Sequence, residues 1–113
     1  MQTIPVVTKL RIQVRNLGWA DVRVYAVRNG VGQRLGLVTH MNSQTFWLSR
    51  NLIDHSTVQL RLAPVGTFRS YTLDPILVGP EQGVHVTVLE RPEQSIVFVR
   101  RDPESTRVGI RRF

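Results

Sequence analysis

The chain is short, rich in arginine and free of cysteine. It has 113 residues, 42% of them hydrophobic, and a formal net charge of +7. A chain of this length and apolar content is expected to fold as one domain with its own core. The missing cysteines exclude disulfides and thiolate metal sites, and no apolar run is long enough to cross a membrane as a helix.

The basic charge is concentrated near the two ends of the chain. Residues 9–34 carry a net charge of +5, residues 35–99 a net charge of −1, and residues 100–113 a net charge of +3. Fourteen of the fifteen basic residues are arginine. Such a skew has two explanations, an anion-binding surface or the codon usage of a GC-rich genome. The composition leaves both open.

Short runs that alternate apolar and polar residues indicate β-strands, with turn residues between them. The strongest hairpin signal is Asn29-Gly30, because both residues tolerate the positive φ of a tight turn. Gly36 indicates a bulge or a close backbone approach inside its strand, and of the neighbours Phe46 and Trp47 one must point into the core. The expected strands are residues 9–15, 22–27, 34–40, 44–48, 57–63, 68–73, 76–78, 84–89 and 95–100.

This pattern predicts an all-β protein, a single antiparallel β-sandwich of about seven to nine short strands. A small closed β-barrel is the alternative. Residues 1–8 are expected to form an N-terminal arm, residues 9–100 the sandwich, and residues 101–113 a basic tail or an edge strand. Residues 49–56 are the only stretch that suits a helical turn. We expect Trp19, in the loop after the first strand, to cap the core rather than lie exposed.

No catalytic or metal-binding pattern stands out. The histidines His40, His55 and His85 form no metal-ligand spacing, and no nucleophile elbow or phosphate-binding glycine loop is present. The acidic residues fall mostly in turns, where turn chemistry explains them. We therefore expect neither enzyme activity nor a cofactor.

One feature favours a nucleic-acid or anionic-surface partner. Outward residues of the first strands combine basic side chains with an aromatic ring, as proteins that bind single strands do. A solvated arginine-rich face is the competing interpretation. This candidate face consists of Lys9, Arg11, Arg15, Arg23, Tyr25, Arg28 and Arg34.

The order of the segments VRVYAVRNG, LGLV, TFWL, VQLRLAPVG and ILVGPEQGVHVTV resembles small immunoglobulin-like or transthyretin-like β-sandwich domains of bacterial envelope proteins and lipoproteins. The resemblance covers residues 9 to 99. It implies a non-catalytic domain, and an extracytoplasmic location if a leader has been removed. The chain departs from the lipoproteins in having no cysteine at a lipid-attachment motif.

The sequence thus predicts a structural or protein-interaction module whose partner is another protein or a second copy of itself. Assembly is expected through edge strands, which offer unpaired backbone groups to a partner. Nucleic acid is the alternative partner. Apolar residues of both termini are candidates for the assembly segments, namely Ile4, Val6, Val7, Val108, Ile110 and Phe113.

Overall fold

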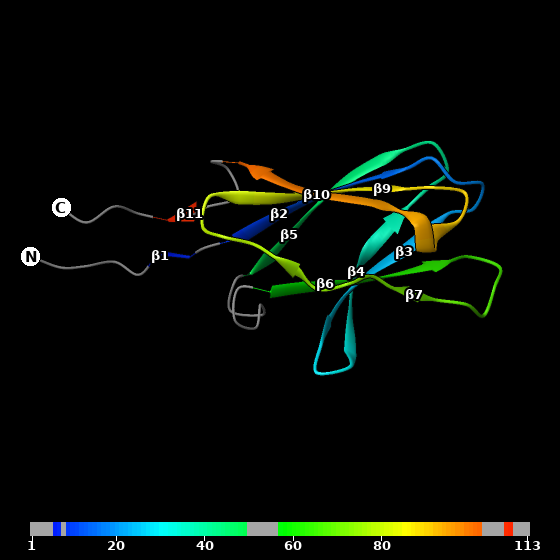
Figure 1. The fold of residues 1–113 in the computed structure, drawn as a ribbon, viewed down its shortest axis with the longest axis horizontal. Coiled ribbons are helices and arrows are strands. Elements are labelled where there is room, and N and C mark those ends of the chain that lie inside the picture. Colours follow the sequence, from blue (N-terminus) through cyan, green and yellow to red (C-terminus); the bar gives the residue numbers. More distant parts are fainter. Residues whose placement is uncertain (1–5, 8, 50–56, 103–107, 110–113) are drawn as a thin grey trace, which may run out of the picture.

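The computed structural model describes residues 6–7, 9–49, 57–102 and 108–109, and its strands form a β-sandwich (Figure 1). The four-stranded sheet has the order β10-β9-β2-β5, and the five-stranded sheet has the order β4-β3-β6-β7, with β8 also pairing with β6. The elements are β1 (Val6–Val7), β2 (Lys9–Asn16), β3 (Val22–Arg28), β4 (Val31–Val38), β5 (Ser43–Ser49), β6 (Thr57–Pro64), β7 (Tyr71–Thr72), β8 (Ile76–Leu77), β9 (Gln82–Val88), the short 3-10 helix η2 (Pro92–Gln94), β10 (Ile96–Arg101) and β11 (Val108–Gly109).

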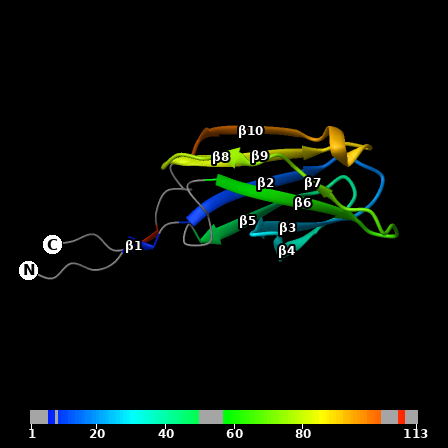
Figure 2. The ribbon, with the colours of Figure 1, turned by 60° about the horizontal axis from the view of Figure 1, so that its bottom comes forward.

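The two sheets pack together over one core, and in the turned view of Figure 2 their strands overlap. Alternation along each strand sends the apolar residues inward, as the sequence predicts. In β2 the buried residues are Leu10, Ile12 and Val14, and in β6 they are Val58, Leu60 and Leu62. The predicted sandwich is therefore confirmed, and the sheets do not close into a barrel.

One strand pair departs from the antiparallel pattern. Strand β2 pairs with β5 on one side in antiparallel fashion and with β9 on the other side in parallel fashion. A parallel pair needs a long connection between its strands, and here that connection contains β3 to β8. Alternation along a strand does not reveal the direction of its neighbour, so the sequence did not predict this pair.

Two local predictions about packing are confirmed. Phe46 is half-buried and packs against the core, whereas the neighbouring Trp47 is 44% exposed. A Cβ atom placed on Gly36 would lie 2.6 Å from the Phe46 ring, so this glycine permits a close approach. The register of β3 against β4 also shifts between Val24 and Tyr25, which are opposite Gly36 and Arg34. Gly36 therefore marks both a bulge and a close contact.

Other local predictions are wrong. Trp19 is 76% exposed and stacks on the ring of His40, with ring centroids 6.4 Å apart, instead of capping the core. The strand expected over residues 68–73 reduces to Tyr71–Thr72, because the turn after β6 extends to a fully exposed Phe68. The helical turn expected over residues 49–56 lies almost entirely outside the described residues.

The described parts of the two termini lie side by side. Strands β1 and β11 form an antiparallel pair, with Val7 opposite Val108, beyond one end of the sandwich. The loops β2–β3 and β6–β7 lie at the opposite end (Figure 1). Within the described residues, no helix has the length and apolar character needed to span a membrane.

Candidate functional site

The outer face of the four-stranded sheet brings aromatic and basic side chains together from all four strands. Strand register sets the rows of neighbours across this face. One row contains Trp47 and Arg11, which are directly opposite each other on β5 and β2. The next row contains Gln13, His85 and Phe98, on β2, β9 and β10. The outward residues of all four strands thus form one continuous surface.

Trp47 and Arg11 form a cation–π pair on this face. The guanidinium carbon of Arg11 lies 5.8 Å from the centre of the Trp47 ring. Trp47 nevertheless keeps 44% of its surface exposed, because β5 is an edge strand with a neighbour on one side only. The pair therefore offers an oriented ring that still has free surface for a ligand.

A second aromatic group stands at the opposite edge of the face. The rings of His85 and Phe98 are stacked with an interplanar angle of 3° and centroids 5.0 Å apart. The guanidinium carbon of Arg100 lies 5.5 Å from the centre of the same Phe98 ring. Phe98 is also 44% exposed. Each edge strand therefore carries one exposed ring with an arginine against it.

Asp102 partly balances the charge of this face. Its carboxylate lies 3.7 Å from the guanidinium of Arg11, and the residue is 8% exposed. Gly83, on β9 between β2 and β10, makes this contact sterically possible, since a Cβ at Gly83 would lie 2.8 Å from Asp102 Oδ2. In the described strands, the outward positions of the face carry no other acidic residue. They carry four basic ones, Lys9, Arg11, Arg15 and Arg100.

The environment keeps His85 neutral at physiological pH. Burial of the imidazole lowers the pKa of His85 below its ordinary value of 6.5, and the positive charges of Arg100 and Arg11 lower it further. The carboxylate of Asp102 opposes this shift. A neutral imidazole adds a flat stacking surface beside Phe98 without adding charge.

Strand β10 also borders a groove at the open side of the sandwich. The groove has a volume of about 710 Å³ and lies between β10 and the segment from Ser70 to Ile76. Val97 and Val99 of β10 line it and pack partly against the core. Ser95, just before the strand, has a buried hydroxyl oxygen with no hydrogen-bond partner in the described part of the chain. No described strand pairs with the outer edge of β10.

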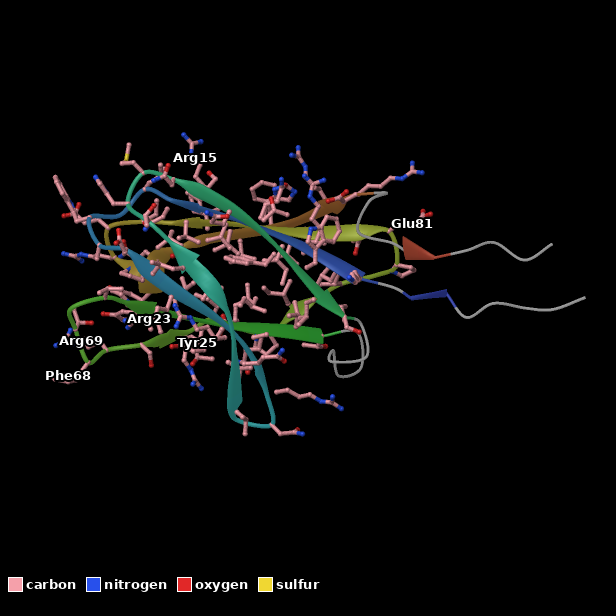
Figure 3. The ribbon with its side chains drawn as sticks, turned by 180° about the vertical axis from the view of Figure 1, so that it is seen from behind. Arg15, Arg23, Tyr25, Phe68, Arg69 and Glu81 are labelled. Carbon is pink, nitrogen blue, oxygen red and sulfur yellow. The ribbon has the colours of Figure 1, made fainter. Side chains whose placement is uncertain are left out.

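The structure divides the basic face expected from the sequence between the two sheets. Lys9, Arg11 and Arg15 lie on the outer face of the four-stranded sheet. Arg23 and Tyr25 lie on the outer face of the five-stranded sheet, and Figure 3 shows them apart from Arg15. Arg34 is opposite Tyr25, and Arg28 ends β3 beside a cavity of about 620 Å³ at the β3–β4 hairpin.

On the five-stranded sheet the aromatic residue is less exposed. Tyr25 is half-buried between Arg34 of β4 and Arg61 of β6. The Arg61 side chain reaches toward β4, where its Nη1 would lie 3.2 Å from a Cβ on Gly32. Its Nε donates a hydrogen bond to Thr72 Oγ1 over 3.2 Å. The aromatic residue of this face is therefore less exposed than Trp47 and Phe98.

Several residues of the candidate site were not identified from the sequence. His85, Phe98 and Arg100 belong to the last two strands of the sandwich, and their alternation does place them outward. What alternation could not provide is the pairing of β2 with β9, which brings these strands beside Arg11 and Gln13. For Trp47 the sequence did contain a signal. Phe46 and Trp47 are consecutive strand residues, so one of the two rings must point out of the core.

The assembly segments expected at the termini are described only in part. Val6, Val7 and Val108 belong to the β1–β11 pair. Ile4, Ile110 and Phe113 lie outside the described residues. In the described ranges, no group of three or more histidine or acidic side chains is arranged to hold a metal ion.

Comparison with known proteins adds no assignment, because no protein-family model matches the chain and no curated protein matches it.

Proposed function

We propose that this protein is a non-catalytic structural module that assembles with a second copy of itself through the edge of β10. The observation that carries the proposal is the exposed, apolar character of the first four residues of this edge strand, which precede Arg100 and Arg101. Ile96 is 54% exposed and Phe98 is 44% exposed on its outer side, while Val97 and Val99 line the groove on its inner side. Monomeric proteins usually protect such edges with charge, proline or a bulge.

The sequence around β10 is complementary to itself in antiparallel register. A pairing centred on Val97 places Phe98 opposite Ile96 of the second copy, an aromatic and β-branched pair of the kind that stabilises sheets. The same register brings Arg101 toward Glu93 of the second copy. A two-fold interface joins identical surfaces in this way. The added strand would also cover Val97, Val99 and the groove beside them.

The test is the mass of the protein in solution, measured by light scattering over a wide range of concentration. We expect a species of twice the chain mass of 12.9 kDa. Ile96→Lys introduces a charge on the paired edge and is expected to give the monomer. Leu77→Lys is the matched control, because Leu77 is an exposed apolar residue of β8 outside the groove.

Three results would overturn the proposal. One is a wild-type protein that stays monomeric at every concentration. Another is an Ile96→Lys variant that keeps the same mass as the wild type. The third is equal dissociation of the Leu77→Lys variant, because any added charge would then suffice. Circular dichroism of each variant establishes that the fold is retained.

A further inference from the structure

We propose that the outer face of the four-stranded sheet is a binding site for single-stranded nucleic acid. The site comprises Trp47, Arg11, His85, Phe98 and Arg100, with Lys9 and Arg15 beside them. This inference does not rest on the proposed self-association, since one copy of the chain carries the whole face.

The rings supply the stacking surface. Bases stack on exposed aromatic side chains irrespective of sequence, because every base has a π face. Trp47 and Phe98 are both partly exposed and each has an arginine against its ring. The stacked partner His85 restricts the Phe98 ring further. The rings are thus oriented before a ligand arrives, which reduces the entropy lost on binding.

The charges supply the attraction for phosphates. Four basic side chains occupy outward strand positions of this face, and the nearby acid, Asp102, contacts Arg11. The remaining excess of positive charge favours an anionic ligand. An acidic partner without planar aromatic groups would contact the basic side chains but would not stack on the exposed rings. A nucleic-acid strand uses both.

The dimensions of the face suit a short single strand. Trp47 and Phe98 lie on β5 and β10, which are three interstrand spacings apart, or about 14 Å at about 4.8 Å for each spacing. A strand running across the sheet from one ring to the other would pass Gln13 and His85. At about 3.4 Å for each nucleotide of one stacked strand, this width corresponds to about four nucleotides, the lower end of the range of about 4–16 nucleotides for single-strand binding domains. In a duplex the bases are stacked on one another and cannot lie on these rings.

The test is binding of a labelled oligothymidylate, single-stranded and in a duplex with oligoadenylate, at low and physiological salt. We expect the single strand to bind more tightly than the duplex. Trp47→Ala is expected to weaken single-strand binding by about 5- to 150-fold, the range for removing one stacking ring. Trp47→Phe, which keeps a ring, is expected to retain most of the affinity.

Trp19→Ala is the matched control. Trp19 is more exposed than Trp47 but lies in the loop between β2 and β3 rather than on a strand of the four-stranded sheet, so its removal is expected to leave binding unchanged. Equal losses for the two tryptophans, tighter binding of the duplex, or no binding at low salt would each overturn the inference. Light scattering on the same samples reports self-association separately, so failure of either proposal can be recognised by itself.

Discussion

The two outer faces of the sandwich carry similar residues in different arrangements. Both combine arginines with an aromatic residue at alternate strand positions. On the five-stranded sheet, Tyr25 lies on the central strand β3 and has Arg34 and Arg61 on either side. On the four-stranded sheet, Trp47 and Phe98 lie on the edge strands β5 and β10 and keep 44% of their surface exposed. The position of a strand in its sheet therefore decides whether its ring is available to a ligand.

The two outer faces belong to sheets that share one core. Leu60 on β6 is fully buried between the sheets, and Leu60→Ala is expected to lower the free energy of unfolding by about 2–5 kcal/mol. Denaturant titration measures this change, and the signals of both sheets should disappear together. Thr45→Ala, at an exposed position of β5, is expected to change stability by less than about 0.5 kcal/mol. Similar values for the two variants would contradict a shared core.

Each sheet has a glycine whose replacement by alanine tests the packing of its outer face. A Cβ at Gly83 would lie 2.8 Å from Asp102 Oδ2 and 3.2 Å from the backbone oxygen of Arg11. Gly83→Ala is therefore expected to cost about 1–3 kcal/mol through overpacking.

The corresponding change on the other face is Gly32→Ala. Its Cβ would meet the far end of the Arg61 side chain at 3.2 Å, and a flexible side chain can move. We expect a smaller loss of stability than for Gly83→Ala, or a slight gain, since alanine restricts the unfolded chain. Thermal unfolding of both variants measures the difference, and a larger loss for Gly32→Ala would contradict the account.

The smallest expected effect concerns the pH dependence of stability. Because the pKa of His85 is lowered in the folded protein, the unfolded chain binds its proton more readily, and stability rises with pH over the range just below 6.5. The contribution of His85 to the stability of the folded protein is fully present above pH 6.5 and declines as the pH falls below that value. His85→Gln is expected to flatten this part of the profile of melting temperature against pH. An unchanged slope in the variant would show that other groups are responsible.

Much of the fold was predictable because it depends on local pattern. Alternation placed Ile12 and Leu60 in the core and Arg11 on the surface, and the Asn29-Gly30 turn followed from its backbone preference. The basic residues that were predicted to form one face lie on two different sheets. Alternation shows which residues of a strand point outward, but it does not show to which sheet the strand belongs. The site also needed the parallel pairing of β2 with β9, which joins distant segments of the chain. The prediction that Trp19 caps the core was wrong, because the Trp19 ring stacks on the ring of His40 instead of packing over the core.

In the proposed binding mode, the outer face of the four-stranded sheet binds single-stranded nucleic acid and the outer face of the five-stranded sheet does not. Two double variants remove two positive charges each, Lys9→Gln with Arg15→Gln on the first face, and Arg23→Gln with Arg34→Gln on the second. The measurement is the dependence of oligothymidylate affinity on salt concentration. We expect the logarithmic slope to fall by about 1.4 for the first pair, at about 0.7 for each phosphate that the protein no longer neutralises, and to stay unchanged for the second. Equal changes in both variants would contradict the account, because binding would then follow net charge alone.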